Sequence, residues 1–312
     1  MNPKSQFIDD DGQVVKQSTG KILWQLTRPH TLTASFVPVL IGTVLAMHYG
    51  DVSVLLFAAM LLSCLFIQIA TNMFNEYYDF KRGLDNEESV GIGGAIVRDG
   101  FKPETVIRLA LSSYGIALLL GVYICMSSSW WLAVVGLIGM GIGYLYTGGP
   151  LPISSTPLGE LLAGLCMGSA FIIISFFIQT GYVNIESILV SIPVAILVGA
   201  INMANNIRDR VGDQESGRKT LAILLGHKKA VTFLGILFAT AYLWIIGLVM
   251  AGILSAWPLV VLLSLPKPLK AYREFIDKKL PVQMVPAMKA TAQTNTIFGL
   301  LLTAGLFIST LV

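Results

Sequence analysis

Seven long stretches of this sequence contain no Asp, Glu, Lys or Arg, and they constrain the fold more than any other feature. An α-helix needs about 20 apolar residues to cross a bilayer, and each stretch is long enough to supply them. Only 12% of the residues are charged and 54% are hydrophobic, whereas a soluble domain carries about 25% charged residues. The chain is therefore interpreted as an integral membrane protein. The stretches are residues 29–50, 52–75, 109–159, 161–185, 187–207, 230–266 and 290–312.

These stretches predict nine membrane-spanning helices and an all-α fold. The 109–159 stretch is long enough for two spans, with a break at the three serines 127–129. The 230–266 stretch holds one span and the start of another, with a break near Ala251 and Gly252. The eighth helix, roughly 256–274, is the least regular, because it carries three prolines and has basic residues in its last turns.

The positions of Lys and Arg predict how the helices are oriented. With nine helices, all 21 Lys and Arg residues lie on one side of the membrane: four in the N-terminal segment, five between helices 2 and 3, six between helices 6 and 7, and six around helices 8 and 9. Basic residues concentrate in cytoplasmic loops. The protein is expected to lie in the plasma membrane. Its N-terminus and these loops are expected on the cytoplasmic side, and its C-terminus outside.

A polar pattern, N-M-x-N-x-x-x-D, occurs twice in the chain, at residues 72–79 and again at 202–209. Each copy ends a long apolar stretch. In a helix, offsets of three and seven residues place the two amides and the carboxylate within an arc of about 60°. Polar groups in a membrane helix are costly, so two matched sets indicate one functional site built from two halves. A further acid follows each copy, Asp85 in the first and Asp213 in the second.

Four helices separate the two copies, and an even number preserves the direction of the chain. We therefore expect a parallel repeat, with helices 1–4 matching helices 5–8 and helix 9 added. Residues 1–20 are polar and are expected to form a flexible cytoplasmic tail, which leaves residues 21–312 as a single membrane-embedded domain. Three cytoplasmic loops are expected to be structured, at residues 79–104, 145–157 and 208–229, because glycine and proline favour turns there.

The chemistry of the repeated pattern points to a metal-bound phosphate. All its candidate ligands are oxygens, a set that suits Mg²⁺, which also shares the phosphate oxygens of its substrate. Lys and Arg residues flank both copies, and cations beside carboxylates favour a diphosphate. The membrane would hold an apolar tail, so an amphiphile such as a prenyl diphosphate fits. Four tyrosines near the pattern could stabilise an allylic cation or merely lie at the membrane interface: Tyr77, Tyr78, Tyr144 and Tyr146.

Other residue types give weaker signals. Cys64, Cys125 and Cys166 have no metal or disulfide spacing and are interpreted as small buried hydrophobes. Glu160 opens the fifth helix and could simply complement the helix dipole.

The repeated pattern resembles that of the UbiA superfamily of intramembrane prenyltransferases, over nearly all of the chain after residue 20. The resemblance implies Mg²⁺-diphosphate binding at the cytoplasmic ends of helices 2 and 6. The first copy departs from the usual family spacing, because Gly83 stands where the last Asp is expected and Asp85 lies two residues further on. Whether Asp85 contacts the metal or the acceptor is open.

The resemblance also implies roles for individual residues. The expected metal ligands are Asn75, Asp79, Asn205, Asp209 and Asp213. The expected catalytic residues are Asp79, Asp85, Asp209 and Asp213. The expected substrate-binding residues are Arg28, Asn72, Lys81, Arg82, Tyr146, Asn202, Arg208, Arg218 and Lys219.

Five strings resemble the branch of the family that prenylates 1,4-dihydroxy-2-naphthoate: residues 75–85, 28–33, 91–94, 146–150 and 218–222. That resemblance implies a polyprenyl diphosphate donor, loss of the naphthoate carboxylate and a place in menaquinone synthesis.

Two alternatives stay open. One is a prenyltransferase for another aromatic acceptor, such as 4-hydroxybenzoate or haem. The other is a secondary transporter, since parallel repeats and intramembrane carboxylates occur there too. Transporter sites lie near the bilayer midplane, however, whereas the acids here are expected at one surface. No nucleic-acid partner is expected, and the sequence does not indicate an oligomeric state.

Overall fold

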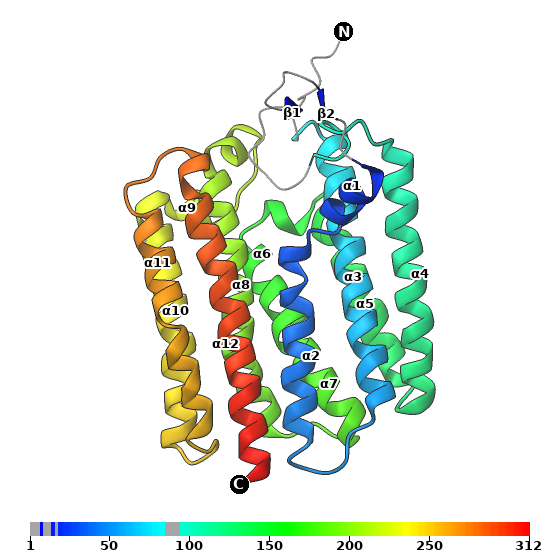
Figure 1. Ribbon diagram of the computed structural model, residues 1–312. Coiled ribbons are helices and arrows are strands. Elements are labelled where there is room, and N and C mark those ends of the chain that lie inside the picture. The colour runs from blue at the N-terminus through cyan, green and yellow to red at the C-terminus, as the bar shows by residue number, and fades with distance from the viewer. Residues whose placement is uncertain (1–6, 9–13, 16–17, 85–93) are drawn as a thin grey trace.

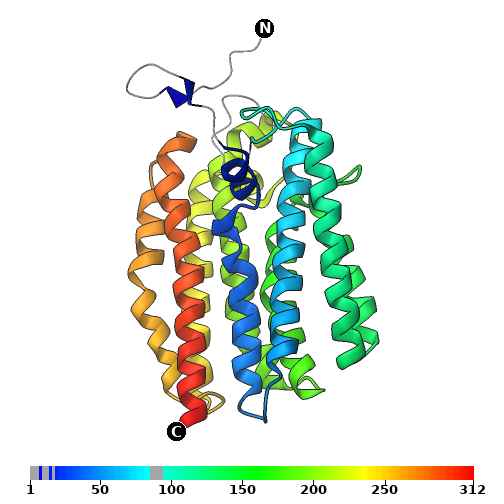
Figure 2. The ribbon, with the colours of Figure 1, turned by 45° about the vertical axis from the view of Figure 1, so that its right-hand side comes forward.

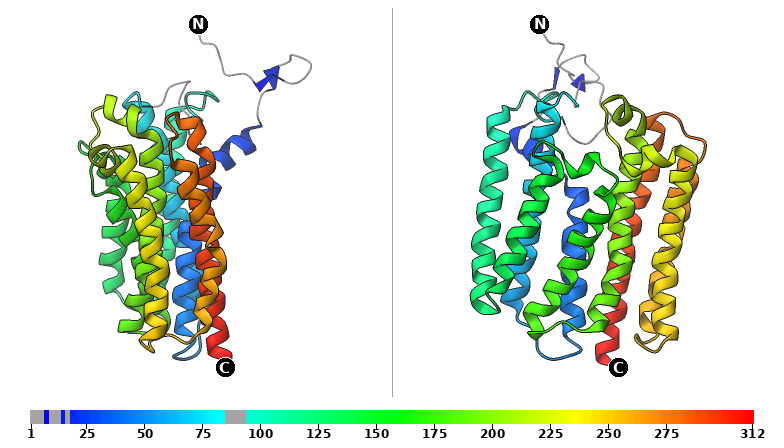
Figure 3. Two further views of the ribbon diagram at one scale, coloured as in Figure 1. Left: turned by 90° about the vertical axis from the view of Figure 1, so that its left-hand side faces the viewer. Right: turned by 180° about the vertical axis from the view of Figure 1, so that it is seen from behind.

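The protein is a bundle of long, roughly parallel and antiparallel helices, seen in a computed structural model that describes residues 7–8, 14–15, 18–84 and 94–312 (Figure 1). The C-terminus lies at one end of the bundle in every view (Figures 1 and 3). The short helices α1 (Thr19–Leu26) and α9 (Leu221–Leu225) lie at the opposite end. The repeated pattern ends there too, so we call it the motif end.

Helices make up almost all of the described chain. The first are α1 (Thr19–Leu26), η1 (Pro29–Thr31), α2 (Thr33–Ala46), α3 (Val54–Lys81), α4 (Pro103–Ser127) and α5 (Trp131–Thr147). Next come η2 (Ile153–Ser155), α6 (Gly159–Ala163), the π-helix η3 (Gly164–Ala170), α7 (Phe171–Thr180), α8 (Ile185–Glu215) and α9 (Leu221–Leu225). The last are α10 (His227–Met250), η4 (Trp257–Ser264), α11 (Pro266–Phe275), η5 (Pro281–Met284) and α12 (Val285–Leu311).

The all-α expectation is confirmed. Within the described residues the exception is an antiparallel pair of two-residue strands, β1 (Phe7–Ile8) and β2 (Val14–Val15). This pair falls in the segment 1–20 that was expected to be a tail, most of which lies outside the described residues.

The number of spans is consistent with nine without being established. In the described chain six helices are long and apolar enough to cross a membrane, and two shorter apolar helices, α2 and α5, accompany them. The expected breaks are present, because α4 ends at Ser127 and α10 ends at Met250. The eighth segment is irregular as expected: it consists of the 3-10 helix η4 and then α11, and prolines occur near the start of both.

The two helices that carry the repeated pattern begin alike. Ser53 caps α3 by accepting a hydrogen bond from the backbone N–H of Leu56 at 3.3 Å. Asn184 caps α8 in the same way, with Ser187 as donor at 2.8 Å. Both caps lie at the end opposite the motif end, and both helices then run the length of the bundle. The pattern therefore emerges at the same end in both copies.

Small residues bring neighbouring helices close together. A Cβ added to Gly42 of α2 would lie 2.3 Å from the carbonyl oxygen of Ile172, and one added to Gly168 of η3 would lie 2.4 Å from the Cα of Ala195 in α8. Such close approach drives helix association in membranes. Helix α2 packs against α12 on one side and against α3 on the other, and α3 packs against α4. Helix α2 therefore lies between the group α10, α11 and α12 and the group α3 and α4 (Figure 2).

Candidate active site

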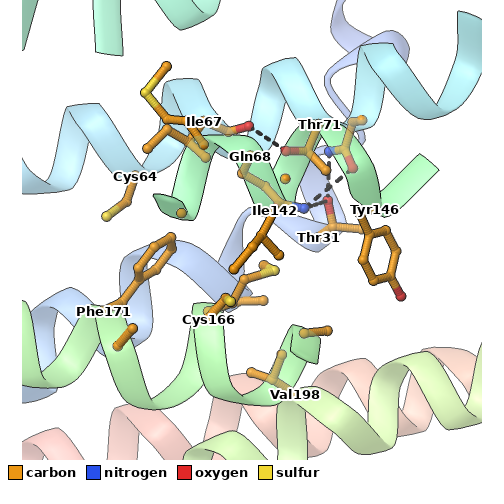
Figure 4. Close-up of a pocket in the computed structure, with 18 of the residues that line it drawn as sticks. Thr31, Cys64, Ile67, Gln68, Thr71, Ile142, Tyr146, Cys166, Phe171 and Val198 are labelled. Atoms are coloured by element: carbon orange, nitrogen blue, oxygen red, sulfur yellow. Dashed lines mark hydrogen bonds between the residues drawn. The ribbon is translucent and has the colours of Figure 1, made fainter. Parts of the chain in front are cut away.

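A cavity of about 1190 Å³ opens among the helices and has two chemically different parts. At the motif end it is lined by polar side chains of η1, α3, α8 and α12. Deeper in the bundle its walls are apolar residues of α3, α4, α5, η3 and α7. Cys64, Ile67, Ile142 and Phe171 line this part (Figure 4). All three cysteines line the cavity. Cys64 and Cys125 are buried as expected, whereas Cys166 is only half-buried.

The first copy of the pattern places Asn72 in a buried hydrogen-bond network beside the cavity. Its Nδ2 donates to the carbonyl oxygen of Thr27 at 2.9 Å and to Oγ1 of Thr31 at 3.0 Å. Its Oδ1 accepts from Nε2 of Gln68 at 3.3 Å. Asn72 thus joins α3 to the segment between α1 and η1.

Arg28 connects this segment to the next turn of α3. Its Nη2 donates to Oδ1 of Asn75 at 3.4 Å and lies 3.6 Å from Oε2 of Glu76. Glu76 is buried, and its Oε1 accepts from the backbone N–H groups of Gly94 at 2.7 Å and Ile96 at 3.3 Å. Arg28 has a left-handed backbone, with φ of 50°, which turns the chain between α1 and η1.

The second copy is arranged similarly. Asn202 donates from Nδ2 to the Tyr146 hydroxyl at 2.9 Å, and Asn206 donates from Nδ2 to Oε1 of Glu160 at 2.8 Å. Asn205 and Tyr146 line the cavity. Of the four tyrosines near the pattern, Tyr146 alone is among the cavity-lining residues that the structure describes; Tyr78 and Tyr144 hydrogen-bond to each other at 2.6 Å.

One guanidinium joins the two halves of the site. Arg218, in the chain after α8, donates from Nη2 to Oδ1 of Asp79 at 3.1 Å and from Nη1 to Oδ1 of Asp213 at 3.0 Å. The three side chains are 11–17% exposed. Oδ2 of Asp213 is buried and has no hydrogen-bond partner within the described residues. The acids of the two copies therefore share one cation.

The other expected site residues have distinct neighbours. Arg208 binds its neighbour Asp209 through both carboxylate oxygens at 2.6 Å. Arg82 lies over the ring of Tyr78 and donates to the carbonyl oxygens of Thr147 and Gly149, so it holds the loop after α5. Lys81 lies 5.9 Å from the ring centre of Tyr77, and the backbone of Lys219 bonds to Ser155. Asp79, Asp209 and Asp213 do not line the cavity itself; the expected residues that do are Arg28, Asn72, Asn75, Tyr146, Asn202, Asn205 and Arg208.

Two expectations lie outside the described residues: Asp85 and the glycine-rich residues 91–93. Sequence reasoning also missed contributors. Arg98 and Lys289 line the cavity, and Glu76 anchors the chain at Gly94. Glu76 lies inside the repeated pattern at the position of Asn206, and Lys289 is a charge on an apolar helix; both signals were available in the sequence.

The residues at the motif end suit Mg²⁺ in their donor chemistry. Carboxylate and amide oxygens are hard ligands, and the unpartnered Oδ2 of Asp213 is available to a cation. In the described parts of the chain, no group of three or more His, Cys, Asp or Glu side chains is arranged to hold a metal ion. Arg218 instead supplies the positive charge between Asp79 and Asp213.

Comparison with known proteins agrees with this architecture. The profile of the UbiA prenyltransferase family matches residues 35–292, so this multi-pass membrane protein belongs to that family. It is 69% identical over 307 residues to the 1,4-dihydroxy-2-naphthoate octaprenyltransferase of Bacillus subtilis (strain 168), a match that covers 98% of this chain and 99% of that one. It is 28% identical to the human UbiA prenyltransferase domain-containing protein 1, over 90% of this chain and 82% of that one.

Solved structures share the fold. A UbiA homologue from Aeropyrum pernix K1 superposes with a TM-score of 0.68 at 15% identity, covering 90% of this chain and 98% of that one. A UbiA homologue from Archaeoglobus fulgidus, bound to DMAPP and Mg²⁺, gives a TM-score of 0.64 at 15% identity and the same coverage.

Proposed function

We propose that this protein transfers a polyprenyl group from polyprenyl diphosphate to 1,4-dihydroxy-2-naphthoate, with loss of the naphthoate carboxylate, in menaquinone biosynthesis. The observation that carries this proposal is the 69% identity to the Bacillus subtilis enzyme over nearly the whole of both chains. The cavity supports it, because its polar end suits a charged head group and its deep apolar part suits a prenyl tail.

The reaction balances without a redox partner. The bond between C1 of the prenyl group and the diphosphate oxygen breaks, and the diphosphate keeps the electron pair. A ring carbon of the electron-rich acceptor forms the new bond to C1. The bond to the carboxylate carbon then breaks, CO₂ leaves, and its electron pair returns to the ring.

In this proposal the residues that would hold Mg²⁺ are Asp79, Asp209 and Asp213, with the amides Asn75 and Asn205. When bound, it supplies the charge that neutralises the departing diphosphate. Asp85, which follows the first copy, belongs to the same proposed catalytic set.

The remaining side chains would position the substrates. Asn72 and Asn202 orient the polar rim through their buried hydrogen bonds. Arg28, Arg208 and Arg218, with Lys81, Arg82 and Lys219 near the rim, contribute positive charge for the diphosphate. The face of Tyr146 borders the cavity, where it could stabilise an allylic cation by about 0.5–2 kcal/mol.

We also propose that the motif end faces the cytoplasm and that the protein lies in the plasma membrane, with residues 1–20 as a cytoplasmic tail. The one-sided distribution of Lys and Arg supports the orientation. A transporter is less well supported, because the carboxylates Asp79 and Asp213 gather at one end of the bundle instead of its middle.

The test uses purified protein in detergent, where no ion gradient exists. With Mg²⁺, a polyprenyl diphosphate and naphthoate labelled in its carboxylate, we expect labelled CO₂ and diphosphate to appear in equal amounts. Parallel reactions with 4-hydroxybenzoate and haem should give no product. Turnover of one of those acceptors in place of the naphthoate would contradict the proposed acceptor, and gradient-driven uptake into liposomes without any product would favour a transporter.

A further inference from the structure

Four cations line the cavity, and one of them has no partner. Arg28 contacts Asn75 and Glu76, and Arg208 is paired with Asp209. Arg98 packs against Gly94, where an added Cβ would lie 2.4 Å from its Nε. Lys289 has no hydrogen bond or ion pair with any described residue, and the described cavity lining contains no Asp or Glu to neutralise it.

Lys289 is also the sole charged residue of the 27-residue helix α12. The cavity-lining residues of this helix recur at helical spacing, and they begin at Val285 and end at Ile297. Lys289 therefore belongs to a continuous stripe that faces the cavity. Lys289 is exposed and lies in the second turn of α12, at the motif end, so its ammonium group is accessible to a ligand that enters the polar part of the cavity.

The next polar residue on this stripe is Gln293, four positions further along the helix. The Nζ of Lys267, in α11, donates to Oε1 of Gln293 at 3.1 Å. An ammonium group can only donate hydrogen bonds, so this contact fixes which end of the amide is oxygen. The amide NH₂ of Gln293 has no acceptor among the described residues and remains available to the cavity.

Residues four apart on a helix have Cβ atoms about 5–6 Å apart, so Lys289 and Gln293 present an ammonium and an amide N–H side by side. Two donors without a nearby carboxylate suit a small anion with two oxygens. The proposed acceptor carries one carboxylate on an apolar aromatic ring, whereas the donor diphosphate is expected at the Asp79 and Asp213 carboxylates.

Resting on the proposed function, we propose that Lys289 and Gln293 form the subsite that binds the acceptor carboxylate, with Lys267 as a positioning residue that orients the Gln293 amide. The subsite selects acceptors that carry a carboxylate, and it is contributed by the helix that lies outside the two repeats. The carboxylate leaves as CO₂ only after the new bond to the prenyl chain has formed, so the subsite holds this group while the acceptor binds. Loss of the subsite should therefore weaken acceptor binding, which KM reports.

The experiment compares Lys289→Met, Gln293→Leu and Lys267→Met with wild type in detergent. The acceptor is either the naphthoate or 1,4-dihydroxynaphthalene, which lacks the carboxylate. Loss of a charge-assisted hydrogen bond weakens binding about 10- to 100-fold. We expect Lys289→Met to raise KM for the naphthoate by that factor, with smaller increases for the other two variants. We expect KM for the prenyl diphosphate and turnover of 1,4-dihydroxynaphthalene to stay within about twofold of wild type.

Lys289→Arg should restore most of the naphthoate affinity. Lys270→Met is the matched control, since Lys270 is an exposed lysine of α11 outside the cavity, and it should behave as wild type. A raised KM for the prenyl diphosphate would assign Lys289 to the donor and overturn the subsite. An equal loss with both acceptors, or no change in KM, would overturn it as well. If wild type makes no product from the naphthoate, the proposed function itself fails.

Discussion

Asn206 donates a 2.8 Å hydrogen bond to Glu160, and this contact occupies the same place in the second repeat as the Arg28–Glu76 contact in the first. Glu76 and Asn206 are the fifth residues of the two copies of the pattern, and Arg28 and Glu160 each lie at the start of the first span of a repeat. Each contact therefore ties the first span to the second. The acid changes place between the repeats. In the first repeat it is Glu76, within the pattern, whereas in the second it is Glu160, outside the pattern, and the pattern supplies the donor Asn206.

Glu160→Ala is expected to lower stability by about 1 kcal/mol, because it leaves the amide of the partly buried Asn206 without its acceptor. Glu160→Gln keeps an acceptor oxygen and should lose much less. Thermal unfolding in detergent measures both, with the exposed Glu104→Ala as a control. Equal stability of Glu160→Ala and the control would contradict a structural contribution from this contact.

Arg218→Ala is expected to destabilise the metal-free protein by about 3 kcal/mol, since it leaves Asp79 and Asp213 as largely buried carboxylates without their shared cation. Mg²⁺ alone should raise the melting temperature of the variant more than that of wild type, because the added cation replaces the lost charge. Arg210→Ala, which removes a cation without a partner among the described residues, is the matched control. If the melting temperature of the variant rises no more than that of wild type, the result would argue against metal binding between these acids.

Asp79→Ala and Asp209→Ala should each reduce turnover by about 100-fold or more while leaving the protein folded, because each removes one half of the charge needed to hold Mg²⁺ and diphosphate. Chelation of Mg²⁺ should do the same to wild type. Product formation is followed by diphosphate release, and folding by gel filtration in detergent. Full activity in excess chelator would remove the metal from the proposal.

Much of the architecture follows from local patterns. Charge-free stretches are enough to identify spanning helices, and a repeat separated by an even number of spans is enough to bring Asp79 and Asp213 to one end of the bundle. The contact through Arg218 could not be derived, because Arg218 lies in a loop whose path depends on tertiary packing. The placement of the acids just outside the cavity was also missed, since helical spacing groups Asp79 with Asn72 but does not say where the cavity wall ends.

The partners of single polar side chains were the least accessible to sequence reasoning. For Glu160 the sequence offered only a bland alternative, a role in complementing the helix dipole, and did not reveal that it accepts a hydrogen bond from Asn206 on another helix. Arg82 was expected to bind substrate, and sequence reasoning did not foresee that it also lies over Tyr78 and holds the loop after α5. Long side chains reach partners on other segments, so sequence position alone does not identify them.

Orientation in the membrane can be tested by labelling single cysteines on a background without Cys64, Cys125 and Cys166. A cysteine at position 215, at the motif end of α8, should be protected from an impermeant thiol reagent in intact cells. One at position 183, before α8 begins, should be labelled. Membrane permeabilisation, which should expose position 215, is the control. Labelling of position 215 in intact cells would invert the proposed topology.

The deep part of the cavity should limit the length of the prenyl chain. Gly121 of α4 lines it, and a Cβ added there would meet no atom within 4 Å, so a larger side chain can enter the open space without displacing a neighbour. Gly121→Leu should therefore raise KM for long polyprenyl diphosphates several-fold and leave dimethylallyl and geranyl diphosphate nearly unchanged, because only a long chain reaches the filled volume. Gly115→Leu is the matched control: it lies on the same helix, also has open space at Cβ, and does not line the cavity. Both changes favour the helix equally, so a difference between them isolates the cavity. Equal KM values for long and short donors in Gly121→Leu would mean that the chain does not occupy this part of the protein.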